Sequence, residues 1–197
     1  MYALRLILLS CCALPLAACG GGNETASGDT NAPAATSRSG SDKFPVYTET
    51  GTIDVVNGAA REKYFTTFNT VPGQPGREVH TASWITMTGT GLPDDIFVSL
   101  SARPAVEPDT ELPEFKIEFS LEPESLQVKE GVPVKVAFTP GGESRHDELS
   151  NAVLTLDQAT RVDEDTLALA GRVAGEMKGK PFSATFAIDK ARNRASK

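Results

Sequence analysis

Cysteine is almost absent from this chain of 197 residues. The only three, Cys11, Cys12 and Cys19, lie within the first twenty positions. No later residue can therefore contribute to a disulfide, a Cys-x-x-Cys redox pair or a thiolate metal site. This scarcity leaves two settings open: a reducing compartment, or an exported domain that folds without disulfides.

Positive charge is also scarce. Lysine and arginine number 19 against 26 acidic residues, which gives a formal net charge of −7. A general nucleic-acid binder needs a basic surface, so the composition argues against nucleic acid as a partner. The exception is a basic C-terminal tail, predicted over residues 190–197, which contains Lys190, Arg192, Arg194 and Lys197. A solvated terminus is the simpler interpretation, and contact with anionic lipid or another envelope polymer is the alternative.

Long hydrophobic runs are missing as well. The most apolar stretch follows Arg5 and extends from Leu6 to Leu16, with Pro15 inside it. A helix that spans a membrane needs roughly 20 apolar residues, so this stretch is too short for a permanent anchor. A charged start followed by a short apolar region is typical of a secretory signal. We therefore predict a signal peptide over residues 1–18.

The apolar stretch ends at Leu16-Ala17-Ala18-Cys19. This segment resembles the lipobox of bacterial lipoproteins, and the resemblance is confined to the N-terminal signal region. It implies that signal peptidase II cuts between Ala18 and Cys19, that the Cys19 thiol receives a diacylglyceryl group, and that the new amine is often acylated. Gly20 follows where an inner-membrane retention signal usually has aspartate, which by the same analogy points to the outer membrane of a Gram-negative cell. An ordinary secretory signal with an incidental Cys19 is the alternative.

A tether follows the cysteine. Residues 20–43 contain no large apolar side chain, so this segment cannot bury enough surface to offset its ordering entropy. We predict that residues 19–43 are the lipidated cysteine and a disordered linker, with an r.m.s. span of about 25–30 Å. Such a linker holds a folded domain clear of the lipid headgroups.

Residues 44–189 have the period-two alternation of half-buried strands. The clearest case places Phe115, Ile117, Phe119 and Leu121 on one face, and the segment 132–138 repeats the pattern. A hairpin is expected around Lys178-Gly179-Lys180. About eight or nine such segments alternate with turns rich in glycine, proline and aspartate, and no segment is convincingly amphipathic as a helix. The sequence predicts an all-β fold, an antiparallel β-sandwich, with a small β-barrel as the alternative.

Three residues are candidates for binding: Trp84, Tyr64 and His146. Trp84 is the only tryptophan, and both it and Tyr64 fit a core position as well as a groove. His146 lies in a polar loop, whereas the other histidine, His80, is expected within a strand. No Gly-x-Ser-x-Gly elbow is present, so no catalytic residue is assigned.

Acidic clusters, among them Asp163-Glu164-Asp165, are expected to be solvated turns, because none has EF-hand spacing. No metal or cofactor is predicted. The sequence favours a non-enzymatic, lipid-anchored binding module of the bacterial envelope, in the periplasm or at the cell surface, whose partner is an envelope protein, a polymer or a small ligand. A periplasmic hydrolase or metal-dependent enzyme, or a small-molecule carrier, is the alternative.

Overall fold

Strands dominate the computed structural model of the chain, which describes residues 45–70, 78–89, 92–107 and 111–195. No residue in these ranges is helical. The predicted signal peptide, the Ala18–Cys19 cleavage site, the lipidated Cys19 and the tether up to residue 43 lie outside the described residues. The prediction of an all-β fold is confirmed.

The described residues form eleven strands of one sheet, and two of these, β3 and β8, have only two residues each. Nine longer strands remain, which agrees with the predicted number. In chain order the strands are β1 (Val46–Asn57), β2 (Ala60–Thr70), β3 (Val79–His80), β4 (Ala82–Gly89), β5 (Leu92–Ala102), β6 (Glu114–Leu121), β7 (Lys135–Thr139), β8 (Asp147–Glu148), β9 (Ser150–Arg161), β10 (Thr166–Met177) and β11 (Lys180–Asn193).

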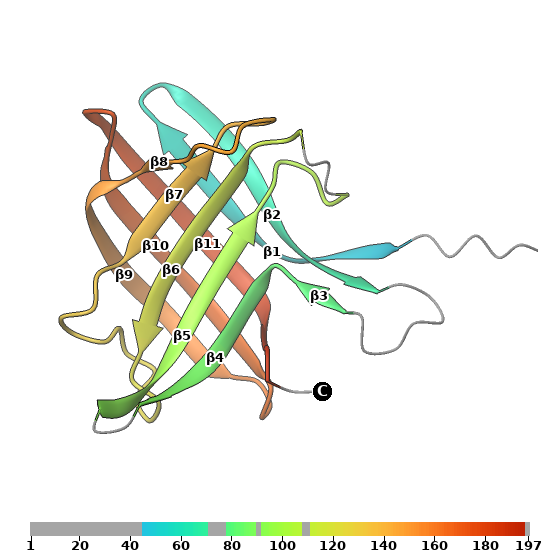
Figure 1. Ribbon diagram of the computed structural model, residues 1–197, viewed down its shortest axis with the longest axis vertical. Helices are drawn as coiled ribbons and strands as arrows, with labels where there is room; N and C mark the ends of the chain where they lie inside the picture. The colour runs from blue at the N-terminus through green and yellow to red at the C-terminus, as the bar shows by residue number, and fades with distance from the viewer. Residues whose placement is uncertain (1–44, 71–77, 90–91, 108–110, 196–197) are drawn as a thin grey trace, which may run out of the picture. The chain divides into compact units, whose positions relative to one another are not determined.

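Strand β11 is the centre of the sheet (Figure 1). It pairs along one edge with β10, which in turn pairs with β9. Its other edge is shared: Phe182–Ile188 pair antiparallel with β1, and Arg192 and Asn193 pair parallel with β4. From β1 the sheet continues to β2 and β3, and from β4 it continues through β5, β6 and β7 to β8.

The sheet curls until its two halves face one another, which is consistent with a β-sandwich or a half-barrel. On one side β2 meets the end of β5, where the amide of Phe65 donates to the carbonyl of Arg103 at 2.7 Å. On the other side the chain passes from β8 through Leu149 directly into β9. The Leu149 amide donates to the Val136 carbonyl of β7 at 2.9 Å. These contacts bring the outer strands back toward each other.

The core fills the space inside the curl. Phe115, Ile117, Phe119 and Leu121 of β6 are at most 1% exposed, as their alternation predicts. Their rings and those of the facing strands lie in contact; for example, the centroids of Phe115 and Phe182 are 5.6 Å apart. Each large side chain buried in this way contributes about 1.5–3 kcal/mol relative to an exposed one. The core is therefore the main source of stability.

Two segments differ from the sequence prediction. The strand expected from residue 132 begins only at Lys135, and Val132 is 36% exposed. The physical reason is Pro133, which has no amide hydrogen to donate to a ladder. At the C-terminus, β11 extends to Asn193, so the first residues of the predicted basic tail are part of a strand. Arg194 follows directly, and its Nε donates to the Ser83 hydroxyl at 2.7 Å.

Candidate functional site

The two aromatic candidates, Tyr64 and Trp84, are core residues. Tyr64 is fully buried and lies with its ring centroid 6.0 Å from that of Phe115. Its hydroxyl donates to Glu62 at 2.6 Å, and burial, followed by this contact, raises its pKa. Trp84 is 3% exposed, and the guanidinium of Arg161 stands 5.4 Å from its ring centroid.

His146 lies apart from these two residues. Its ring is exposed, and its Nε2 lies 3.3 Å from Oε1 of Glu148. The residue lines a hollow of about 510 Å³ over β6, β7 and β8. Neither Tyr64 nor Trp84 lines this hollow. The structure therefore does not gather the three sequence candidates into one site.

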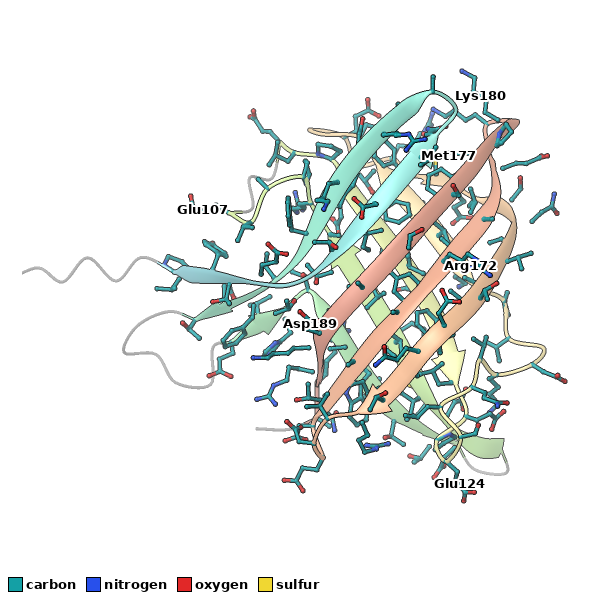
Figure 2. The ribbon with its side chains drawn as sticks, turned by 180° about the vertical axis from the view of Figure 1, so that it is seen from behind. Glu107, Glu124, Arg172, Met177, Lys180 and Asp189 are labelled. Carbon is teal, nitrogen blue, oxygen red and sulfur yellow. The ribbon has the colours of Figure 1, made fainter. Side chains whose placement is uncertain are left out.

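A different pocket forms where two paired strands separate. Strand β1 leaves β11 beyond the pair Gly51–Ile188, because β11 continues toward β4 while β1 continues with β2 alone. Figure 2 shows Asp189 at the point where the ribbons of the two strands part. We call the resulting cavity, about 290 Å³ in volume, the fork pocket. Its lining comes from five strands, β1, β2, β3, β10 and β11, and from the turn before β10. The polar and aromatic lining residues are Thr48, Glu49, Thr50, Phe68, His80, Asp163, Thr166, Asp189, Lys190 and Arg192.

Both strands of the fork are bulged at this point. In β1, Glu49 and Gly51 pair with the consecutive β2 residues Thr67 and Thr66, so Thr50 between them is an extra residue. In β11, Asp189 and Lys190 together stand opposite one residue of β10. A bulge bends its strand and redirects its side chains, and bulges are frequent beside functional sites. The two irregularities therefore explain both the separation of the strands and the polar residues that face the cavity.

An aromatic pair forms one wall of the fork pocket. Phe68 of β2 and His80 of β3 are direct cross-strand partners, and their rings stack with centroids 4.4 Å apart. The Nδ1 atom of His80 is buried and has no hydrogen-bond partner among the described residues. Burial lowers the pKa of His80, and the nearby charge of Arg192 lowers it further. The imidazole is therefore neutral at neutral pH.

The lining also contains a charge pair between two partly exposed side chains, Arg192 and Asp163. Nη1 of Arg192 donates to the Thr166 hydroxyl at 2.8 Å and lies 4.0 Å from Oδ1 of Asp163. The hydrogen bond from Thr166 lowers the pKa of Asp163, with further help from the Asp165 amide and Arg192. The Asp163 carboxylate consequently stays ionised and compensates the charge of Arg192.

Displaced pKa values concentrate at this pocket. His80 and Asp163 are two of the three described side chains with a resolved shift, and both line it. Asp163 is exposed and its shift comes mainly from hydrogen bonds within its own turn, so of the two only the partly buried His80 is the kind of perturbed group that indicates a functional site. Within the described ranges, no three histidine, cysteine or acidic side chains are grouped so that they could hold a metal ion.

Sequence reasoning did not find the fork pocket because no local motif encodes it. His80 was expected only as a strand residue, Asp163 as part of a solvated turn, and Lys190 and Arg192 as parts of a tail. They meet because β11 changes partners and two bulges shift the register.

Comparison of the chain with protein-family models, with curated proteins and with solved structures found no significant match. The described ranges contain no helix with the length and apolar character needed to cross a membrane.

Proposed function

We propose that this chain is a bacterial lipoprotein whose β domain is a non-enzymatic binding module, with the fork pocket as its ligand site. Support for the anchor comes from Leu16-Ala17-Ala18-Cys19, which follows a short apolar run in the order that a lipobox requires. Two or more acyl chains hold a protein stably on a membrane, whereas one chain holds it only marginally. We therefore propose that the protein is held in the envelope. Gly20, in place of the aspartate of an inner-membrane retention signal, supports the outer membrane, with the domain in the periplasm or at the cell surface.

The observation that carries the binding role is the fork pocket itself. It combines a stacked aromatic pair and charged groups in one cavity of about 290 Å³. Small-ligand sites typically combine a few oriented polar groups with apolar or aromatic walls in a concave cavity.

The anchor is tested by fractionation of cells that produce the Cys19→Ser protein. We expect this protein to leave the membrane fraction and to lack the mass of the lipid, while Cys12→Ser, which changes a cysteine of the signal peptide, behaves as wild type. A Cys19→Ser protein that stays in the membrane fraction at the wild-type mass would refute lipidation.

The binding role is tested by site-specific photocrosslinking in intact envelopes. Val162 is 59% exposed and lines the fork pocket, whereas Val153 on β9 is 64% exposed and does not line it. A photoreactive amino acid at position 162, but not at 153, is expected to give a crosslinked product. Equal products from the two positions, or none from position 162, would contradict a ligand site at the fork.

A further inference from the structure

Both strands of the fork have an unpaired backbone edge at the pocket. Among the described residues, the edge of β1 that pairs with β11 from Gly51 onward has no partner over Val46–Thr50, where β1 keeps only its ladder with β2. The facing edge of β11 likewise has no partner between Ile188, where the ladder with β1 ends, and Arg192, where the pairing with β4 begins. Outside the ladders, no backbone hydrogen bond within the described ranges reaches either stretch.

An unpaired strand edge is complemented by another extended polypeptide segment. Its N–H and C=O groups point outward from alternate residues, and a second strand presents the same groups at the matching spacing. In the five residues Val46–Thr50, about two or three direct these groups into the gap. Addition of an extended peptide to such an edge is a recurrent mode of recognition, in which the main chain supplies affinity and side-chain contacts supply specificity.

The charges that line the pocket do not favour an ion of either sign. Glu49 and Asp189 bring carboxylate acceptors, whereas Lys190 and Arg192 bring N–H donors. A polypeptide backbone is uncharged and offers one donor and one acceptor at each residue other than proline. A mixed lining of this kind is therefore compatible with a neutral segment of chain.

Apolar side chains adjoin the free edge of β1. Phe68 is the cross-strand partner of Thr48, and both residues line the pocket. Val46 is 55% exposed and, two positions before Thr48, lies on the same face of β1. Val162, 59% exposed, lines the pocket from the turn before β10. An apolar side chain of a bound segment therefore finds apolar contacts in this pocket.

We infer that the fork pocket binds an extended segment of a partner protein, which adds as a strand to the free edge of Val46–Thr50 and places an uncharged side chain against Phe68. This assignment rests on the proposed binding function and names the ligand class of the same pocket.

The test is calorimetric titration of the mature lipidated protein in non-ionic detergent. The probe is an acetylated and amidated peptide in which seven residues alternate between threonine and valine, with a lysine at each end for solubility. The first control is the same peptide with a methyl group on every threonine and valine backbone nitrogen, which removes the donors and keeps the side chains. The second is maltose, which has donors and acceptors but no strand edge.

We expect saturable binding of the unmethylated peptide with a Kd at or below about 1 mM. The methylated peptide should bind at least about tenfold more weakly, because two or three hydrogen bonds are together worth that factor or more. Absence of saturable binding by the unmethylated peptide at that concentration would overturn the assignment. Equal or tighter binding of the methylated peptide or of maltose would do the same.

A matched pair of variants locates the bound segment. Val46 and Val79 are both 55% exposed, so a lysine at either position should leave the fold intact. Val79 pairs with Asn69, the neighbour of Phe68, and so lies on β3 with its side chain on the opposite face from Phe68. Lysine protects natural strand edges, because an added strand would take its ammonium group out of water. Val46→Lys should therefore lose most of the peptide binding, whereas Val79→Lys should bind as wild type. Wild-type affinity in Val46→Lys, or an equal loss in both variants, would refute the assigned edge.

The outcomes separate the two proposals. If the crosslink from position 162 forms but the peptide does not bind, the ligand class is wrong and the binding module stands. If neither occurs, both proposals fail.

Discussion

Gly51 is the residue of β1 at the fork end of the ladder with β11, where it pairs with Ile188. It has no room for a side chain. A Cβ atom placed there would stand 2.5 Å from the Ala187 carbonyl oxygen, 2.6 Å from the Ile188 Cα and 2.8 Å from the Ile188 Cδ1. Two of these atoms belong to the backbone of β11 and cannot rotate away. Gly51→Ala must therefore push β1 off β11 at the point where the fork begins.

Overpacking of this kind costs about 1–3 kcal/mol. For a chain of this length each kcal/mol lowers the melting temperature by about 2–4 °C, so Gly51→Ala should lose about 2–12 °C. Thermal unfolding followed by circular dichroism measures this change.

A second substitution identifies the atoms responsible. Ile188→Val removes Cδ1, the only side-chain atom among the three contacts, at a cost of about 0.5–1.5 kcal/mol by itself. Because the backbone contacts remain, Gly51→Ala with Ile188→Val should stay less stable than Ile188→Val alone. Recovery of that stability in the double variant, or a Gly51→Ala protein that melts within about 1 °C of wild type, would refute the backbone clash.

Three further changes test other parts of the domain. Phe115→Ala should lower the free energy of unfolding by about 3–5 kcal/mol in urea, because it empties the centre of the aromatic core, whereas the exposed Val153→Ala should have little effect. Burial lowers the pKa of His80 below its ordinary 6.5, so the imidazole binds a proton more tightly in the unfolded chain than in the folded one. The contribution of the neutral His80 to stability is therefore present above about pH 6.5 and is lost as the pH falls below it. His80→Gln should show a smaller loss of stability to urea between pH 7.5 and 5 than the wild type. Lys178 has a φ of 53° in the turn before β11, a conformation that asparagine adopts more readily than lysine. Lys178→Asn should therefore raise the free energy of unfolding by about 0.5 kcal/mol and the melting temperature slightly. A lower melting temperature would show that the ion pair of Lys178 with Asp147 outweighs the backbone strain.

The regular parts of the fold were predictable from the sequence because pairing and burial leave a period-two pattern. The segment from Phe115 to Leu121 and the hairpin at Lys178-Gly179 formed as that pattern predicts. The same pattern misled at Val132, since alternation of side chains does not register the missing amide hydrogen of Pro133. The fork pocket was beyond prediction for a related reason: a bulge is a single extra residue, and the period on either side of it remains two.

The bulge in β11 connects the core to the pocket. Along this strand the buried side chains are spaced by two up to Ile188, but the next buried residue is Ala191, three positions later. Without the extra residue, Ala191 would point outward and the strand beyond it would present the wrong face to the core. With it, the core stays continuous, β11 reaches β4, and Asp189 and Lys190 are displaced from the ladder toward the gap that β1 leaves. The irregularity that preserves the packing of the core is thus the one that supplies charged groups to the proposed site.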